Sequence, residues 1–291
     1  MKLATFTENH RRRIGVVDGD TIVDLATAAP NLPQSMLAFL RAGPAAMAEA
    51  KTAALQASRR LSLSKVRLEA PVPRPGKVLA IGLNYADHVR EGNRPMPEHQ
   101  IWFSKQATCI VGPNDPIRIP KVSDKIDYEA ELCVVIGRKC RHVPASRAFE
   151  VIAGFMCGND VSVRDWQQRS PTMMMGKGFD THGPTGPWIV TPDEVADVHN
   201  LPIRCLVNGQ VMQQASTAEM IFKIPAQIEH LTAAFTLEPG DVIFTGTPAG
   251  VGVYRNPPVR LKAGDKVRVE IDGLGTLENL CENESGEMII V

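Results

Sequence analysis

Two glutamates stand two residues apart in the segment Asp127-Tyr128-Glu129-Ala130-Glu131, and a third carboxylate, Asp160, follows an apolar segment. The stretch from Tyr128 to Ile136 is rich in β-branched residues, which predicts a strand. Side chains alternate faces along a strand, so Glu129 and Glu131 should point the same way. Two adjacent negative charges favour a divalent cation, and oxygen ligands favour a hard ion such as magnesium. The alternative is a solvated strand face, which is the commoner explanation of an isolated pair.

A second pair of residues could act as a general base. His88 and Glu91 follow an apolar run at a spacing of three, so they share a face if this stretch is one turn of helix. A carboxylate beside an imidazole holds the ring in one tautomer and raises its basicity, which suits it to deprotonate water. The alternative is a surface turn in which the two residues are neighbours by chance.

Two glycine-containing turns could bind an anionic substrate. Lys177 stands between Gly176 and Gly178, which allow close backbone approach, so an inward ammonium could neutralise substrate charge. The segment from Phe244 to Val253 is not a phosphate-binding loop, because it lacks the Gly-Lys-Ser/Thr ending. Its amides and Thr247 could still bind a carboxylate. The alternatives are a solvated lysine and a tight hairpin. Arg164 and Asp165 could simply form a local ion pair on a following turn, which would contribute little stability.

Short β-branched runs alternate with turn signals from Lys77 onward, and many strands with few helices predict a sandwich or roll. The predicted strands are 77–81, 101–103, 116–119, 131–136, 188–190, 203–207, 241–245 and 266–271. Helices are predicted at Ser146 to Phe155 and Pro225 to Phe235.

The N-terminal part has a different pattern. Residues 1–26 predict a β-meander with a turn at Asp18 to Asp20, and residues 35–58 predict two helices divided at Gly43-Pro44. The proline-rich stretch from Ala70 to Gly76 reads as a linker. We therefore predict a small α+β accessory domain over residues 1–70 and a metal-dependent catalytic domain over residues 71–291.

Composition excludes several classes of partner. The 291 residues are 44% hydrophobic and carry 32 basic against 32 acidic side chains, so bulk attraction to nucleic acid or an anionic membrane is absent. No apolar run approaches the length of a membrane span, and charge interrupts the N-terminus early. We expect a cytoplasmic protein with a small-molecule substrate. The six cysteines lack a C-x-x-C pair and should be reduced packing residues.

Five ordered motifs together resemble the fumarylacetoacetate hydrolase family, most closely its acylpyruvase and oxaloacetate decarboxylase branch. They span residues 82–91, 128–132, 158–165, 176–180 and 245–252. The resemblance implies a β-rich α+β fold, a mixed-sheet β-roll, and a homodimer. It also implies a magnesium ion, or manganese or calcium in its place, held by Glu129, Glu131 and Asp160.

The resemblance further assigns roles around that ion. It implies that Lys177 and Gln167 contact substrate, that Thr247 meets the substrate carboxylate, and that His88 with Glu91 lies on a mobile lid. We also expect Gly246 and Tyr85 to contact substrate. One departure matters: the founding branch has a metal-binding aspartate seven positions before its catalytic histidine, and Ile81 occupies that place here.

We therefore hypothesise a hydrolase that cleaves a C–C bond in an acylpyruvate-like 2,4-dioxo acid. The metal would stabilise the carbanion as an enolate, and the His88–Glu91 pair would activate water. The alternatives are an oxaloacetate decarboxylase and an isomerase or hydratase of 2-oxo-enoic acids, which use the same enolate chemistry. A non-catalytic metal-binding protein is disfavoured by the presence of His88, Glu91 and Lys177 together.

Overall fold

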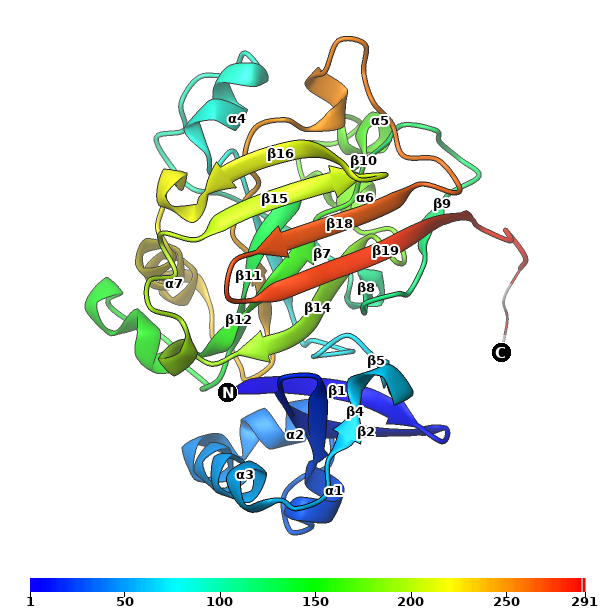
Figure 1. Cartoon of the computed structure of the whole chain (residues 1–291). Helices are drawn as coiled ribbons and strands as arrows, with labels where there is room; N and C mark the ends of the chain where they lie inside the picture. The colour runs from blue at the N-terminus through cyan, green and yellow to red at the C-terminus, as the bar shows by residue number, and fades with distance from the viewer. Residues whose placement is uncertain (289, 291) are drawn as a thin grey trace.

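The computed structural model describes residues 1–288 and residue 290. Its N-terminal elements lie together at the bottom of Figure 1, below the β-rich body. The predicted meander and the division of the two helices at Gly43 are confirmed. The elements are β1 (Lys2–Glu8), β2 (Arg11–Asp18), β3 (Thr21–Asp24), α1 (Leu25–Ala28), α2 (Met36–Arg41), α3 (Gly43–Gln56), β4 (Leu61–Ser62), η1 (Leu63–Lys65) and β5 (Arg67–Leu68).

Within the described residues, twelve strands form one mixed sheet, in the main order β4-β3-β2-β1-β14-β12-β11-β17-β6-β7. Most neighbours are antiparallel, but β17 pairs with β6 in parallel. The strands of this sheet beyond the N-terminal part are β6 (Val78–Gly82), β7 (Ile101–Lys105), β8 (Ile110–Val111), β11 (Ala130–Ile136), β12 (Ile152–Asn159), β14 (Gly183–Val190) and β17 (Val242–Phe244).

A second sheet packs against this one, with the order β16-β15-β18-β19-β9. Its strands are β9 (Ile117–Ile119), β15 (Pro202–Val207), β16 (Gln210–Ser216), β18 (Lys266–Ile271) and β19 (Gly275–Asn283). Inward residues such as Cys205 and Val269 join Leu132 and Phe155 of the large sheet in one apolar core. The predicted β-rich, mixed-sheet roll is confirmed. The short strands β10 (Ile126–Asp127) and β13 (Ser162–Val163) pair separately.

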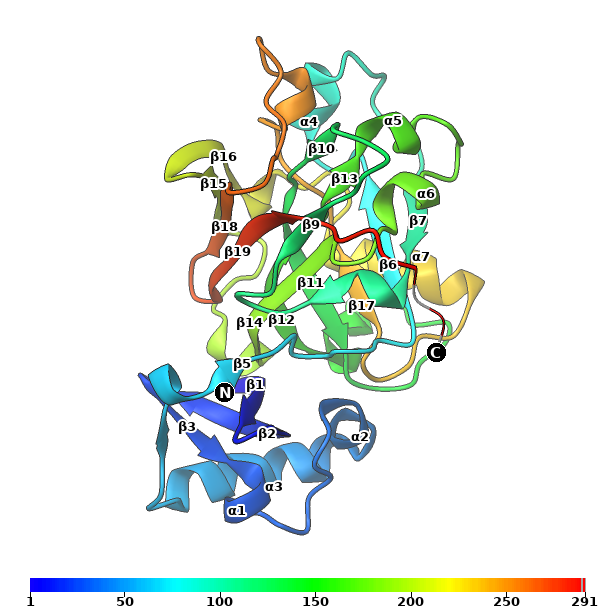
Figure 2. The same ribbon diagram turned by 90° about the vertical axis from the view of Figure 1, so that its right-hand side faces the viewer.

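The N-terminal elements are continuous with the body in both sheet and core. Leu3 of β1 pairs with Ile189 of β14, so the meander extends the large sheet. Phe39 of α2 shares an apolar cluster with Cys133 of β11 and Phe244 of β17, on the opposite face from the second sheet. Figure 2 shows the N-terminal elements from the side, beneath the body. These contacts give residues 1–70 a fixed place against the strands that carry the site.

The helices of the body are short and connect the strands. They are α4 (Ala86–Glu91), η2 (Ala107–Cys109), η3 (Ala145–Val151), α5 (Arg164–Gln167), α6 (Met174–Lys177), η4 (Pro192–Glu194), η5 (Thr217–Glu219), α7 (Ile224–Ala234) and η6 (Gly252–Tyr254). The helix predicted near Pro225 is confirmed as α7. The helix predicted over 146–155 is wrong beyond Val151, because Ile152 begins β12 and pairs with β11. In the part of the chain that the structure describes, no helix is long and apolar enough for a membrane span.

Candidate metal and catalytic site

Three carboxylates meet where β11 begins and β12 ends. Carboxylate oxygens of Glu129, Glu131 and Asp160 all lie within 4.8 Å of one another, and the three side chains are buried. The antiparallel register causes this meeting, because it sets Glu131 opposite Gly158 and leaves Asp160 just beyond the end of β12. Asn159 also connects the two ends, since its Oδ1 accepts a hydrogen bond from the Glu129 amide at 3.0 Å. Burial excludes the solvated strand face that an isolated pair of glutamates would suggest.

Cationic side chains face these carboxylates. Nζ of Lys177 lies 2.6 Å from Oε2 of Glu129 and 2.8 Å from Oδ2 of Asp160. Nη2 of Arg164 lies 2.7 Å from Oε1 of Glu129, and Nζ of Lys105 lies 2.5 Å from Oδ1 of Asp160. Both oxygens of Glu129 and both oxygens of Asp160 are therefore paired with cations, as buried carboxylates require.

Glu131 has a different environment. Its Oε2 accepts a hydrogen bond from the Gly246 amide at 2.7 Å, and within the described residues it forms no ion pair. Burial raises the pKa of Glu131 well above its ordinary value, and the two neighbouring carboxylates raise it further. Burial also acts to raise the pKa of Glu129, but its two cationic partners outweigh that effect and hold the pKa at about 2. Glu131 is therefore the carboxyl group of the cluster that holds a proton most readily, and its ionised form would lack a cationic partner among the described residues.

The charges and ligand atoms fit a divalent cation. Among the described residues, four carboxyl groups, counting Asp127 beside Arg164, face three cationic groups, so full ionisation of the four would leave one negative charge in excess. A buried charge is costly unless it is paired, so an added cation beside Glu131 would stabilise the site. Carboxylate oxygens are the ligands that magnesium, manganese and calcium prefer. Such an ion would compete with Lys177 for the oxygens of Glu129 and Asp160.

The predicted pair of His88 and Glu91 is present on one turn of α4. Nδ1 of His88 lies 2.7 Å from Oε1 of Glu91, and Oε2 of Glu91 accepts a hydrogen bond from the Gly250 amide at 2.8 Å. The ring of Tyr254 lies beside the imidazole, with ring centroids 6.2 Å apart. Because Nδ1 faces the carboxylate, Nε2 is the nitrogen left to exchange a proton with a ligand.

One cavity of about 590 Å³ is lined both by the carboxylate cluster and by His88. Its lining includes the three carboxylates together with His88, Lys177, Gln167 and Thr247. Apolar side chains that include Ile81, Phe103 and Met173 line the rest. This volume suits a small organic acid, and a mixed apolar and charged lining is typical of small-molecule sites.

Two residues that we expected to contact substrate do not line this cavity. Tyr85 is 1% exposed, and its hydroxyl finds no hydrogen-bond partner among the described residues. Burial raises the pKa of this hydroxyl, and the negative charge of Glu131 adds to the rise. The Gly246 amide is already bonded to Glu131, so it positions a carboxylate. As the structure stands, neither residue offers a group to a ligand.

Gln213 is a site residue that the sequence did not indicate. Its Oε1 accepts a hydrogen bond from the Ala130 amide at 2.9 Å, and its Nε2 donates to Oγ1 of Thr247 at 2.8 Å. The Thr247 hydroxyl in turn donates to the Ala130 carbonyl at 2.9 Å. Gln213 thus fixes the start of β11 against the turn that carries Thr247. A glutamine in the polar strand β16 gives no local sign of this role.

Among the described residues, the local ion pair that Arg164 and Asp165 could have formed is absent. Arg164 turns into the site and bonds Asp127 with its Nε at 2.8 Å, whereas Asp165 accepts a hydrogen bond from Ser123 at 2.6 Å. A guanidinium group that lies between two buried carboxylates gains more interaction energy than a guanidinium group that pairs with an exposed neighbour. Lys105 was also not predicted, because a lysine at the end of an apolar strand carries no signal of its distant partner.

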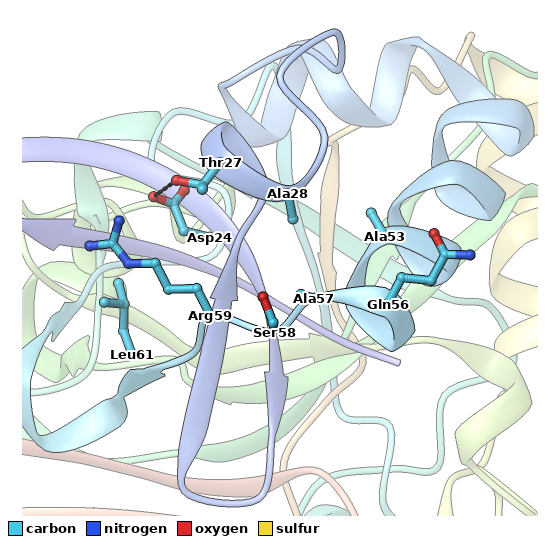
Figure 3. Close-up of a pocket in the computed structure, with 9 residues that line it drawn as sticks. All are labelled: Asp24, Thr27, Ala28, Ala53, Gln56, Ala57, Ser58, Arg59 and Leu61. Carbon is cyan, nitrogen blue, oxygen red and sulfur yellow. Dashed lines mark hydrogen bonds between the residues drawn. The ribbon is translucent and has the colours of Figure 1, made fainter.

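A separate hollow of about 230 Å³ lies among the N-terminal elements, between the end of α3 and the α1 region (Figure 3). Its acidic residue, Asp24, already accepts hydrogen bonds from the Ala26 amide at the start of α1 and from the Arg13 guanidinium. Thr27 also points to this carboxylate, at 3.4 Å. These polar groups hold α1 in place, so we assign no chemistry to this hollow.

A β-roll in which one cavity is lined by buried carboxylates and by a histidine paired with a glutamate has the features of an enzyme. Residues 77–281 match the family described as fumarylacetoacetate (FAA) hydrolase C-terminal, which is more than half of the chain. The chain belongs to the fumarylacetoacetate hydrolase family, as its motifs indicated.

Named relatives and solved structures agree with this assignment. A mitochondrial oxaloacetate tautomerase of Xenopus laevis is 46% identical over 285 residues, covering 96% of this chain and 89% of the relative. One of Homo sapiens is 47% identical over 264 residues, covering 90% and 84%. The structure resembles maleylpyruvate hydrolase from Sphingobium sp. SYK-6 in complex with manganese(II) and pyruvate, with a TM-score of 0.83 and 33% identity, covering 98% of this chain and 100% of that one. Fumarylacetoacetate hydrolase from Exiguobacterium antarcticum gives a TM-score of 0.86 and 34% identity, with the same coverage.

These relatives correct one expectation. We expected a cytoplasmic protein, because charged residues interrupt the first apolar positions and no apolar run approaches the length of a membrane span. The oxaloacetate tautomerases of Xenopus laevis, Bos taurus and Homo sapiens that resemble this chain are all named as mitochondrial. The expectation was wrong, since overall charge and the lack of an apolar run do not distinguish compartments.

Proposed function

We propose that this chain is a divalent-metal-dependent oxaloacetate tautomerase, which interconverts the keto and enol forms of a 2-oxo dicarboxylic acid. The observation that carries the proposal is the single cavity that contains both the carboxylate cluster and His88. The names of the relatives that share 46–47% of their residues with the chain support the choice of substrate. Tautomerisation needs only an electrophile at the 2-oxo group and a base at the adjacent carbon.

The carboxylates and their cationic partners prepare one end of the cavity for the substrate. A divalent ion held by Glu129, Glu131 and Asp160 would supply Lewis-acid chemistry, drawing electron density from the 2-oxo group. Lys177, already buried beside two of these carboxylates, would place its ammonium near the anionic end of the substrate. The apolar wall that includes Phe103 would exclude water from the reacting carbons.

The His88–Glu91 pair performs the proton transfer. Nε2 of His88 takes the proton from carbon 3, the C–H electron pair becomes the double bond between carbons 2 and 3, and the π pair of the 2-oxo group moves onto its oxygen. The same proton is then delivered to the oxygen on carbon 2, which gives the enol with atoms and electrons in balance. Glu91 accepts a hydrogen bond from Nδ1–H and stabilises the transient imidazolium. The reverse sequence returns the keto form.

A second candidate function is hydrolysis of a C–C bond in an acylpyruvate. The same His88–Glu91 geometry suits activation of water, and a maleylpyruvate hydrolase has a closely similar structure. Our hypothesis from the sequence placed this reaction first, with decarboxylation and isomerisation as alternatives. The names of the relatives now favour tautomerisation. A 2-oxo acid substrate and enolate chemistry are common to all four reactions.

A direct assay separates these reactions. The purified chain with Mn²⁺ or Mg²⁺ is given enol-oxaloacetate, acetylpyruvate and maleylpyruvate, and enol absorbance, pyruvate and carbon dioxide are followed. We expect enol absorbance to decay much faster than in buffer, without carbon dioxide. Pyruvate release from an acylpyruvate with no change in the oxaloacetate enol rate would instead identify a hydrolase. Carbon dioxide release from oxaloacetate would identify a decarboxylase.

We further propose that the chain works as a homodimer, as its family resemblance suggested. The structure describes one chain, so the proposal rests on family membership. Light scattering coupled to size-exclusion chromatography tests it directly. A single species of about 32 kDa, equal to the mass of one 31.7 kDa chain, would contradict it.

A further inference from the structure

Asp127 is a buried carboxylate that the proposed reaction does not use. It is 1% exposed and does not line the cavity that contains the carboxylates and His88. Its Oδ1 accepts hydrogen bonds from the Tyr128 amide at 2.9 Å and the Gly252 amide at 2.7 Å. Its Oδ2 accepts from the Val253 amide at 3.0 Å and from Nε of Arg164 at 2.8 Å. A carboxylate with this many donors is strongly fixed in place.

The backbone at Gly252 is shaped to receive this carboxylate. A Cβ atom built on Gly252 would lie 2.6 Å from Oδ1 of Asp127 and 2.2 Å from the Val259 carbonyl oxygen. Both distances are shorter than any real Cβ contact, so a residue with a side chain could not approach Asp127 this closely. The close approach ties residues 250–254, hereafter the 250–254 segment, to the residue just before Tyr128 and Glu129.

The same segment supports the His88–Glu91 pair. The Gly250 amide donates to Oε2 of Glu91 at 2.8 Å, and the ring of Tyr254 lies beside His88 with centroids 6.2 Å apart. Figure 2 shows this segment, coloured orange, beside α4 at the top of the molecule. α4 is only six residues long, and its N-cap side chain forms no capping hydrogen bond with any residue that the structure describes, so contacts from outside the helix must fix its position.

The side chain of Tyr128, the residue after Asp127, also bonds to the 250–254 segment. The Tyr128 hydroxyl donates to the Gly250 carbonyl at 3.1 Å. Arg164 completes the connection, because Nη2 of the same guanidinium lies 2.7 Å from both Oδ2 of Asp127 and Oε1 of Glu129. Asp127 therefore touches, on one side, the segment that holds the proton-transfer pair and, on the other, the arginine that holds a carboxylate of the cluster.

We propose that Asp127 is a positioning residue, which acts through the 250–254 segment to hold His88 and Glu91 at a fixed place relative to Glu129, Glu131 and Asp160. The inference rests on the proposed role of His88 and Glu91 in proton transfer. A proton-transfer base must lie within hydrogen-bond reach of its substrate, and a displacement of about 1 Å costs roughly a hundredfold in rate. Asp127 supplies that accuracy without touching the substrate.

The test is Asp127→Asn, which preserves size but replaces one acceptor oxygen by a donor that faces other donors. The matched control is Asp241→Asn. Asp241 is also 1% exposed and accepts hydrogen bonds from the Lys77 and Glu238 amides and from the Lys77 ammonium, but it does not line the cavity. Steady-state kinetics, Mn²⁺ titration and hydrogen–deuterium exchange are measured on the full chain for both variants.

For Asp127→Asn we expect kcat to fall about a hundredfold with little change in KM. The Kd for Mn²⁺ should change by less than about tenfold, the low end of the loss for a direct partner of a metal ligand, because Asp127 reaches Glu129 through Arg164. Peptides covering residues 86–92 and 250–254 should exchange at least about tenfold faster than in the wild type. Asp241→Asn should leave kcat and the exchange of both regions unchanged. A merely structural role would lower stability in both variants but would not move kcat and these two regions together.

Three results would overturn the proposal. The first is that Asp127→Asn shows the same kcat and the same local exchange rates as the control variant. The second is that Asp127→Asn loses as much affinity for Mn²⁺ as it loses in kcat. Should Asp127→Asn fail to fold, Tyr128→Phe releases the same segment at Gly250. It should raise exchange over 86–92 and lower kcat several-fold, and wild-type behaviour in both would be the third overturning result. If the wild type turns over none of the proposed substrates, the exchange data still decide the positioning role.

Discussion

Nζ of Lys105 lies 2.5 Å from Oδ1 of Asp160, and both side chains are almost completely buried. The same ammonium donates to the backbone carbonyl of Lys177. Lys105 therefore connects the end of β7 to one carboxylate of the cluster and to the helix that carries the other lysine. A buried ion pair of this kind gives little net stability, but loss of one partner leaves the other charge uncompensated.

Lys105→Met should destabilise the protein by about 3 kcal/mol, because it leaves Asp160 with Lys177 as its remaining cationic partner. Urea unfolding at pH 7 without added metal measures the change. Added Mn²⁺ should restore part of the loss by supplying positive charge. Lys51→Met is the matched control, since the exposed Lys51–Asp193 pair should contribute little. An equal shift of the urea midpoint in both variants would show that the buried ion pair of Lys105 contributes no more to the free energy of unfolding than the exposed pair of Lys51.

Glu131→Gln should separate two effects of this carboxyl group, its cost to the stability of the metal-free protein and its contribution to metal binding. Glutamine keeps an acceptor for the Gly246 amide but removes the charge, so the metal-free variant should melt at the wild-type temperature or higher. Mn²⁺ at a hundredfold excess over Kd should stabilise the wild type by roughly 3 kcal/mol and the variant by much less. Turnover should be lost along with metal binding. Thermal unfolding with and without Mn²⁺ measures both effects, and the exposed Glu98→Gln serves as the control.

Full metal-induced stabilisation of the Glu131→Gln variant would remove Glu131 from the ligand set. Full turnover by the variant would contradict the proposed chemistry as well.

Local patterns predicted the parts of the site that are near each other in sequence. Glu129 and Glu131 are separated by two positions, and His88 and Glu91 by one helical turn, so strand and helix geometry alone places each pair. Asp160 could be added because it follows an apolar segment that ends in a polar one. The resemblance to the family then predicted that these groups belong to one site.

The partners of these groups could not be predicted in the same way. Lys105 and Asp160 are brought together by a sheet in which three strands, β6, β17 and β11, separate β12 from β7, the strand of Lys105. No local pattern specifies such an order. The apolar run Ile152–Asn159 fits a helix or a strand, and only its pairing with β11 decides. Strand β19 was missed because polar residues interrupt it, although Leu277, Asn279 and Cys281 are buried on alternate positions.

His88→Ala and Glu91→Gln should each lower turnover by a factor of about 10²–10⁴, the usual contribution of a general base. Neither residue belongs to the carboxylate cluster, so Mn²⁺ affinity should remain as in the wild type. Asp87→Ala is the matched control, because Asp87 lies on the same helix and, within the described part of the chain, pairs with Arg90 alone at the surface. Mn²⁺ titration and enol decay rates are measured for all three variants. Turnover retained in His88→Ala would mean that another group transfers the proton.

His182 should make stability depend on pH. Its side chain is fully buried, and its Nε2–H donates to the Arg118 carbonyl at 2.9 Å. Burial lowers the pKa of His182 from 6.5 to about 4, despite that hydrogen bond. The unfolded chain therefore binds a proton more readily than the folded one. The contribution of His182 to the free energy of unfolding is therefore fully present above about pH 6.5. It is lost as the pH falls toward 4, and the loss amounts to roughly 3 kcal/mol. Urea unfolding between pH 7 and 4.5 should show a smaller loss in His182→Gln than in the wild type or in the exposed-residue control His10→Gln. Parallel pH curves for all three proteins would assign the acid sensitivity to other groups.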